Sequence, residues 1–175
     1  MSPDMKSINE RFATTKVLVV DDEHFMRKVV RTLLMSLGVR AIYEAHDGVS
    51  GLNAIRSLAP HVVILDWQMP GLDGAAFARM VRSPDTFPYP DIPIIMLTGH
   101  AERARVMEAV EIGVNEFLLK PVSTKALHDR MVSVLARPRP LLSEGNSLKL
   151  APRHAPVPDI HADNDETIAN LVMLN

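Results

Sequence analysis

Five side chains that could act together on a phosphate or a metal ion each follow a short, largely apolar run. They are two neighbouring aspartates, a third aspartate, a threonine and a lysine: Asp21, Asp22, Asp66, Thr98 and Lys120. Carboxylates gathered in one place repel one another unless a cation lies between them, and an oxygen-only set of ligands suits Mg²⁺. An ammonium and a hydroxyl would complement the negative charge of a transferred phosphoryl group. These residue types predict Mg²⁺ binding and phosphoryl chemistry, provided that the fold brings them together.

Each of these residues also has an ordinary structural interpretation. Asp22 could cap the helix that follows it, and an aspartate at the end of a strand could simply be solvated. The step from Lys120 to Pro121 could be nothing more than a turn. The functional interpretation is favoured because all five residues stand at the ends of successive predicted strands.

The apolar runs that precede these residues alternate with segments of helical periodicity. The first run, Lys16 to Val20, is β-branched and predicts a strand buried on both faces, and apolar residues from Phe25 to Leu37 then recur every three or four positions up to Gly38. Four further strand-helix pairs follow: 40–45 with 49–58, 62–65 with 75–81, 92–97 with 101–112, and 116–119 with 124–135. Five such units predict a parallel sheet with helices on both faces. Ligands of such sheets bind at the carboxyl ends of the strands, where the five residues stand.

The remaining segments carry weaker signals. Residues 1–15 hold charges of both signs without an apolar core, so we expect a flexible N-terminal segment and no secretory signal. Four prolines within residues 83–93 predict a stiff loop that either shapes a partner surface or merely connects. Residues 137–175 hold five of the 13 prolines and predict a flexible tail, in which residues 165–174 form either a short terminal helix or an unstructured end.

Composition narrows the class of protein. The 19 lysines and arginines against 21 aspartates and glutamates give a weak electric field, which argues against nucleic acid as a direct partner. No apolar run approaches the roughly 18 residues that a membrane span needs. The absence of cysteine removes disulfides and thiolate nucleophiles. We therefore expect a cytoplasmic protein with one domain over residues 16–136 and no membrane partner.

The residues around the five positions resemble the receiver domains of two-component signalling, of the stand-alone chemotaxis type. The motifs are the runs 17–23, 65–74, 97–99 and 119–121. The run Asp-Trp-Gln-Met-Pro-Gly-Leu-Asp-Gly that begins at Asp66 is highly specific, and the likeness covers residues 16–136. The resemblance implies an α/β fold with a doubly wound five-stranded parallel sheet, in the flavodoxin-like strand order 2-1-3-4-5 with helices on both faces.

The resemblance also assigns roles to residues of the cluster. Asp66 would accept a phosphoryl group from a sensor histidine kinase or a histidine phosphotransfer protein. Asp22, Asp66 and the backbone carbonyl of Gln68 would hold Mg²⁺, with Asp21 acting partly through water. Thr98 and Lys120 would contact the phosphoryl oxygens.

The resemblance further implies how the signal is reset. Hydrolysis of the acyl phosphate would end it, at a rate influenced by the positions of Gln68 and His100, although His100 is as readily an ordinary exposed side chain. We therefore expect a phosphorylation-dependent signalling protein, with at most weak self-dephosphorylation, and not an enzyme.

Signal output in such a protein depends on a switch residue and on a contact surface. The resemblance pairs Thr98 with a switch aromatic at Phe117, which lacks the hydroxyl of the tyrosine often found there and is either mobile or always buried. The 39 residues beyond Ala136 are too few and too polar for a separate output domain. Output is therefore expected through protein contacts of the 101–135 face, with an unidentified downstream protein or a second copy in a homodimer.

Two other classes share parts of this pattern. A phosphatase of haloacid dehalogenase type also has an aspartate nucleophile after a buried strand, but it needs a second aspartate where this chain has Gln68. A flavodoxin-like module that binds flavin needs a phosphate loop rich in serine, threonine and glycine, and the carboxylates of Asp21, Asp22 and Glu23 would repel phosphate there. No Walker loop or Rossmann glycine fingerprint is found in the sequence.

Overall fold

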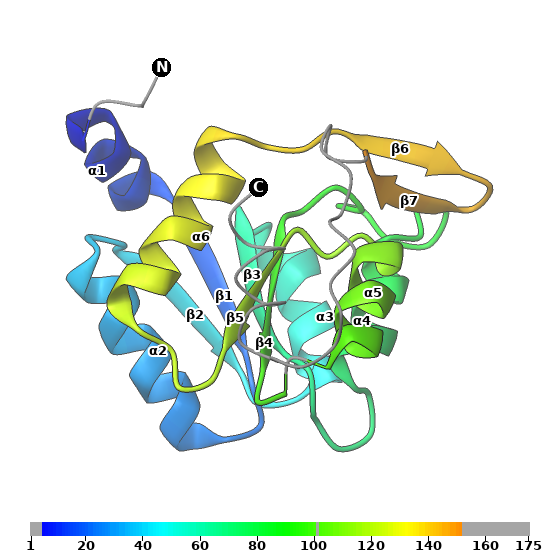
Figure 1. Cartoon of the computed structure of the whole chain (residues 1–175), viewed down its shortest axis with the longest axis horizontal. Helices are drawn as coiled ribbons and strands as arrows, with labels where there is room; N and C mark the ends of the chain where they lie inside the picture. The colour runs from blue at the N-terminus through cyan, green and yellow to red at the C-terminus, as the bar shows by residue number, and fades with distance from the viewer. Residues whose placement is uncertain (1–4, 101, 152–175) are drawn as a thin grey trace.

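The computed structural model describes residues 5–100 and 102–151. At its centre a parallel sheet has the strand order β2-β1-β3-β4-β5 (Figure 1). The strands are β1 (Lys16–Val20), β2 (Ala41–Ala45), β3 (Val62–Asp66), β4 (Ile94–Thr98) and β5 (Glu116–Leu119). The helices between and after them are α2 (His24–Ser36), α3 (Gly48–Leu58), α4 (Gly74–Val81), α5 (Arg103–Ile112) and α6 (Thr124–Ala136). The predicted doubly wound fold and its strand order are confirmed.

The sheet separates two apolar layers. Leu18 and Val20 point into the layer that α3, α4 and α5 cover, and Val17 and Val19 into the layer that α2 and α6 cover (Figure 1). All residues of β3 and β4 are buried, which explains why the central strands are continuous apolar runs without alternation. Among the described residues, no helix is long and apolar enough to cross a membrane.

The strand register aligns the ends of the strands at one edge of the sheet. Val20 pairs with Leu65, Asp66 with Leu97, and Thr98 with Leu119. Because a slip of one residue would turn every side chain to the opposite face, burial on both sides fixes this register strongly. The residues that follow β1, β3, β4 and β5 are therefore held at a common edge.

The expectation of a flexible segment over residues 1–15 is corrected by helix α1 (Met5–Thr14). Ile8 and Phe12, four residues apart on this helix, are buried in the layer that contains α6. The Phe12 ring packs edge-on against His128 of α6, and Arg11 Nη1 donates a hydrogen bond of 2.8 Å to the Leu135 carbonyl oxygen. Two apolar residues spaced four apart predict a helix only weakly from sequence, but in the fold they pack against α6.

The expectation of a flexible tail is also corrected, for residues 141–150. Strands β6 (Leu141–Glu144) and β7 (Ser147–Leu150) form an antiparallel hairpin that turns at Gly145, whose φ is +60°, and that lies beside α5 (Figure 1, orange). The Leu148 amide donates a hydrogen bond of 3.0 Å to the Arg82 carbonyl oxygen, and Leu150 is buried. The terminal helix expected over residues 165–174 lies outside the described residues.

A fully buried arginine connects segments at the opposite end of the strands, just before β4 and β5. Arg82 donates hydrogen bonds to the carbonyl oxygens of Gly113 (3.0 Å), Pro90 (2.7 Å) and Ile92 (2.7 Å), and to Asn115 Oδ1 (2.9 Å). Burial lowers the pKa of Arg82 to about 10, so the guanidinium remains charged at neutral pH. These four acceptors connect α4, the proline-rich loop and the segment before β5.

Candidate functional site

The aligned strand ends bring three carboxylates together. Asp21 and Asp22 follow β1, and Asp66 is the last residue of β3; one oxygen of each lies within 4.8 Å of the others. Asp21 and Asp66 are buried, whereas Asp22 is exposed. The cluster thus has a buried base and one side open to solvent, and it joins three residues that the sequence predicted as metal ligands.

Lys120 reaches the same cluster from the end of β5. Its Nζ atom lies 3.0 Å from Asp66 Oδ1, 3.3 Å from Asp21 Oδ2 and 4.0 Å from Glu23 Oε1. The Lys120 amide also donates a hydrogen bond of 2.9 Å to the Thr98 carbonyl oxygen, and the peptide bond to Pro121 is cis. The predicted juxtaposition of the lysine with Asp66 is present, and Glu23 is a neighbour that the sequence did not suggest.

Burial and charge perturb the ionisation of these groups. Burial raises the pKa of Asp66 to about 6. The ion pair with Lys120 lowers this pKa, and the negative charge of Asp21 raises it further. Burial likewise raises the pKa of Asp21. Burial alone would lower the pKa of Lys120, but its contacts with Asp66 and Asp21 raise it overall. One ammonium therefore compensates the carboxylates only in part, and the site favours an additional cation.

The donor set fits Mg²⁺. The side-chain ligands that the described cluster offers are carboxylate oxygens, and the exposure of Asp22 leaves room for the waters that Mg²⁺ usually keeps. Gln68 lies two residues beyond the end of β3 with an exposed side chain, on the same edge of the sheet.

Thr98 ends β4 at this edge, and its side chain is engaged with its own loop. Its hydroxyl donates a hydrogen bond of 2.8 Å to the His100 carbonyl oxygen and accepts one of 3.2 Å from the His100 amide. Thr98 is buried, whereas His100 is exposed. The threonine thus shapes the turn that leads to α5, and its hydroxyl would have to leave His100 to meet another partner.

Phe117 lies away from the carboxylates, on β5. It pairs with Met96 and is 3% exposed, among the apolar side chains on the α5 side of the sheet. Its carbonyl oxygen accepts a hydrogen bond of 3.1 Å from Arg130 Nε on α6. The aromatic side chain that the sequence singled out therefore points into the core in this structure.

The last two residues of the motif that begins at Asp66 are Asp73 and Gly74, and they shape the junction between β3 and α4. Asp73 caps α4 by accepting a hydrogen bond of 2.8 Å from the Ala76 amide, so it is not part of the carboxylate cluster. A Cβ atom on Gly74 would lie 2.5 Å from the Asp66 carbonyl oxygen. Glycine is needed at this position because the backbone of α4 approaches that of Asp66 directly.

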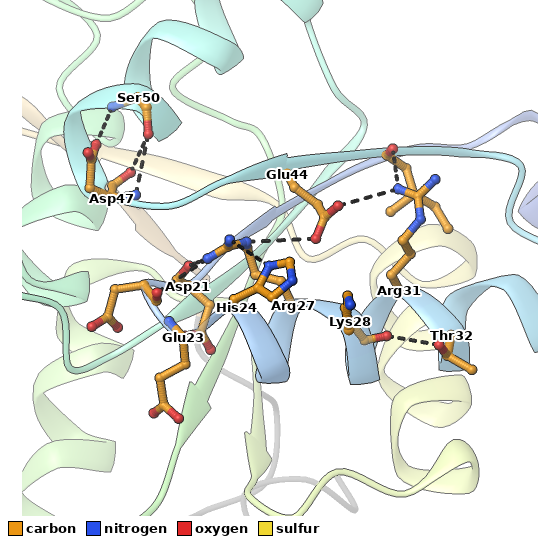
Figure 2. Close-up of polar contacts among 12 residues, drawn as sticks. Asp21, Glu23, His24, Arg27, Lys28, Arg31, Thr32, Glu44, Asp47 and Ser50 are labelled. Atoms are coloured by element: carbon orange, nitrogen blue, oxygen red, sulfur yellow. Dashed lines mark hydrogen bonds and ion pairs between the residues drawn. The ribbon is translucent and has the colours of Figure 1, made fainter.

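Sequence reasoning missed Arg27, whose guanidinium contacts the backbone of the acidic pair. Its Nη1 atom donates a hydrogen bond of 2.7 Å to the Asp21 carbonyl oxygen. Figure 2 draws the contacts between Arg27 and Asp21. A usable signal was present, because Arg27 lies in the first turn of a predicted helix, where the helix dipole disfavours a cation. A cation in that position indicates that other groups hold it.

Comparisons with known proteins agree with this geometry. The chain matches the family model of the response regulator receiver domain over residues 17–132. It is 32% identical over 122 residues to chemotaxis protein CheY-3 of Vibrio cholerae, covering 70% of this chain and 92% of that protein. It is 36% identical over 121 residues to chemotaxis protein CheY1 of Helicobacter pylori, covering 69% and 96%. The solved structure of Vibrio cholerae chemotaxis protein CheY4 is similar with a TM-score of 0.60 and 29% identity, covering 71% and 98%.

Proposed function

The chain belongs to the response regulator receiver family, and on that premise we propose that it is a phosphorylation switch whose phosphate acceptor is Asp66. The observation that carries the proposal is the contact between Lys120 Nζ and Asp66 Oδ1, at 3.0 Å, beside the carboxylates of Asp21 and Asp22. A phosphoryl group on Asp66 would lie between a fixed positive charge and a cation site. The phosphatase and flavin-binding alternatives have no comparable support.

The three carboxylates differ in their suitability as acceptor. Asp21 accepts a hydrogen bond from the Glu23 amide at one oxygen and contacts Lys120 with the other. Asp66 contacts Lys120 through Oδ1, and within residues 5–100 and 102–151 its Oδ2 has no polar partner. Asp22 also has carboxylate oxygens without a partner in the described residues, but it forms no ion pair with Lys120 there, so only Asp66 combines a free oxygen with a contact to the ammonium. Asp66 is therefore the acceptor that the contacts favour.

The proposed reaction moves a phosphoryl group from a histidine to a carboxylate. The nitrogen–phosphorus bond of a phosphohistidine breaks as an Asp66 oxygen–phosphorus bond forms in line, and the imidazole leaves. The donor would be a sensor histidine kinase or a histidine phosphotransfer protein. Lys120 would offset the charge of the phosphoryl oxygens, and the Thr98 hydroxyl would bind one of them after it leaves the His100 carbonyl oxygen.

Asp21, Asp22, Asp66 and the backbone carbonyl of Gln68 would hold Mg²⁺. When bound, the ion would neutralise the carboxylates and the charge that develops on the phosphoryl oxygens. Hydrolysis of the acyl phosphate would restore Asp66, and the exposed side chains of Gln68 and His100 would influence access of water to it. We propose only weak self-dephosphorylation, because in the described structure neither side chain is fixed by a partner.

Signal output is proposed to occur through protein contacts of the 101–135 face. Phe117 is already buried, so its inward position does not require phosphate. The net charge of −2 favours a protein target or a second copy of the chain over nucleic acid.

Intact-protein mass spectrometry with a small phosphodonor and Mg²⁺ tests the proposed function. The wild type should gain one phosphoryl group, and Asp66→Asn should gain none. Asp85→Asn replaces an exposed aspartate outside the carboxylate cluster. It serves as the matched control and should be labelled like the wild type. Equal labelling of Asp66→Asn and the wild type would refute the assignment of the acceptor.

A further inference from the structure

Arg27 binds the main chain of the acidic pair with one atom of its guanidinium. Nη1 donates a hydrogen bond of 2.7 Å to the Asp21 carbonyl oxygen and one of 3.3 Å to the Asp22 carbonyl oxygen. Nη2 lies 3.3 Å from His24 Nδ1, and Nε lies 3.7 Å from Glu44 Oε1 of β2. All three nitrogens of the group are thus engaged (Figure 2). The side chain is only 13% exposed.

These two carbonyl oxygens belong to the two peptide planes that flank the Cα atom of Asp22. When both planes are held, the backbone dihedral angles of Asp22 are held as well, and they determine where its Cα–Cβ bond points. The Asp22 carboxylate itself has no hydrogen-bond or ion-pair partner in the described part of the chain. Its position in the cluster therefore depends on the backbone. Asp21 also holds the peptide plane after Asp22, since its Oδ1 accepts from the Glu23 amide, so the plane before Asp22 is the one that depends most on Arg27.

Asp21 is held differently. Its amide donates to the Ala45 carbonyl oxygen at 3.2 Å, its Oδ1 accepts from the Glu23 amide at 2.8 Å, and its Oδ2 contacts Lys120. The loss of Arg27 would leave these three contacts in place. Because the Glu23 amide belongs to the peptide plane after Asp22, that plane would keep one support. The effect of such a loss should therefore fall mainly on the plane between Asp21 and Asp22, and through it on the direction of the Asp22 side chain.

Arg27 is itself supported from β2. Glu44 contacts Arg27 through Oε1 and Arg31 through Oε2, each at 3.7 Å, and Arg31 Nη1 also donates to the Ile42 carbonyl oxygen at 3.2 Å (Figure 2). Arg31 does not contact the acidic pair. The two arginines therefore stand on the same helix with the same carboxylate partner and differ in whether they reach the backbone of Asp22.

We propose that Arg27 is a positioning residue that orients Asp22 for the bound cation, an inference that rests on the proposed function. The positive charge of Arg27 would by itself repel Mg²⁺, and in the first turn of α2 it is disfavoured by the helix dipole. Its contribution is therefore geometric, through the two carbonyl oxygens. The geometric and the Coulombic effects have opposite signs, so they can be separated by experiment.

The test is a Mg²⁺ titration of the full chain, followed by the fluorescence of Trp67, the single tryptophan, which directly follows Asp66. Arg27→Met should weaken Mg²⁺ binding by about 10- to 100-fold, the range typical of residues that orient metal ligands. Arg31→Met removes the same charge from the same helix and is the matched control. The proposal is supported if Arg27→Met weakens binding more than threefold beyond Arg31→Met, and it is overturned by a smaller difference or by tighter binding.

Arg27→Lys keeps the charge and replaces Arg27→Met in the test if that variant does not fold. One ammonium lacks the shape to bind both carbonyl oxygens and Glu44 together. Arg27→Lys should also weaken Mg²⁺ binding more than threefold relative to Arg31→Met. In phosphorylation by a small phosphodonor, the Mg²⁺ concentration for half-maximal rate should rise in the Arg27 variant, with recovery of the rate at saturating Mg²⁺. An unchanged half-maximal concentration would overturn the positioning role.

The wild-type titration separates the two levels of inference. If the wild type binds Mg²⁺ and is phosphorylated at Asp66 while the Arg27 variants match the Arg31 control, the positioning role is wrong and the proposed function stands. If the wild type neither binds Mg²⁺ nor is phosphorylated, the proposed function itself fails.

Discussion

Lys120 Nζ lies 3.0 Å from Asp66 Oδ1, and this contact joins the ends of β5 and β3. The same ammonium lies 3.3 Å from Asp21 Oδ2. It forms ion pairs with Asp66 and Asp21, and one charge does not balance three carboxylates. The chemistry and the stability of the site should therefore both depend on the ionisation of Asp66.

Replacement of Asp66 by asparagine should stabilise the metal-free protein near neutral pH. Burial raises the pKa of Asp66 from 3.8 to about 6, so the folded protein retains a proton that the unfolded chain has lost between these values. The contribution of protonated Asp66 to the free energy of unfolding is fully present below the pKa of the unfolded chain, 3.8, and is lost as the pH rises through the pKa of the folded protein, about 6. With about 1.4 kcal/mol per pKa unit, the gain of Asp66→Asn near pH 7.5 should be on the order of 2–3 kcal/mol.

Urea unfolding with a chelator present, near pH 7.5 and near pH 4, measures this difference. Asp66→Asn should exceed the wild type in free energy of unfolding at the higher pH and approach it at the lower one. Asp85→Asn is the control for the loss of an exposed carboxylate. The same Asp66→Asn difference at both pH values would show that ionisation is not its cause.

Gly74→Ala should displace the end of β3, where Asp66 stands. The added Cβ atom would lie 2.5 Å from the Asp66 carbonyl oxygen, so the backbone of α4 or β3 must move. We expect a loss of about 1–3 kcal/mol in the free energy of unfolding, typical of overpacking, together with weaker Mg²⁺ binding. Gly99→Ala is the matched control, since its Cβ atom would meet nothing within 4 Å. Similar losses from both substitutions would contradict this interpretation.

Thr98→Ala should separate phosphorylation from its effect on α5 and β5. The Thr98 hydroxyl bonds to the His100 carbonyl oxygen in this structure, and a phosphoryl group on Asp66 would draw it away. In backbone NMR spectra, phosphorylation of the wild type should shift signals from Thr98 to Glu116, and Thr98→Ala should be phosphorylated with smaller shifts there. The change in partner affinity on phosphorylation should lie within the usual range of about 5- to 150-fold.

His100→Ala is the control for this experiment, because the contact with Thr98 uses only the main chain of His100. It should retain the NMR response of the wild type. Shifts confined to the loop after Asp66 in the wild type, or a full response in Thr98→Ala, would disprove the coupling.

Removal of the hairpin should destabilise the domain. A chain that ends at Ala136 loses the buried side chain of Leu150 and the hydrogen bond between Leu148 and Arg82. Burial of one leucine is worth about 1.5–3 kcal/mol, so we expect a loss of roughly 2 kcal/mol in urea unfolding. A chain that ends at Ala151 keeps both contacts and is the comparison. Equal stability of the two truncated chains would show that the hairpin contributes nothing.

The sheet and the carboxylate cluster could be predicted because both follow from local rules. Continuous apolar runs predict buried parallel strands, and the ends of such strands meet at one edge, so Asp21, Asp66 and Lys120 had to converge. Arg27 could not be placed in the same way, since its position in the first turn of α2 indicates only that some group holds it, and a hydrogen bond from a side chain to a main-chain carbonyl oxygen leaves no periodic trace in sequence. Helix α1 was missed because the burial of Phe12 depends on α6, a partner far along the chain.

The central claim is that Asp66 carries the phosphoryl group, and chemical trapping of the acyl phosphate tests it most directly. Borohydride reduces an aspartyl phosphate to homoserine, which peptide mass spectrometry can locate after treatment of the protein with a small phosphodonor and Mg²⁺. We predict homoserine at position 66 and unmodified aspartate at positions 21 and 22. Homoserine at either of those positions, or phosphorylated protein that yields no homoserine, would contradict the claim.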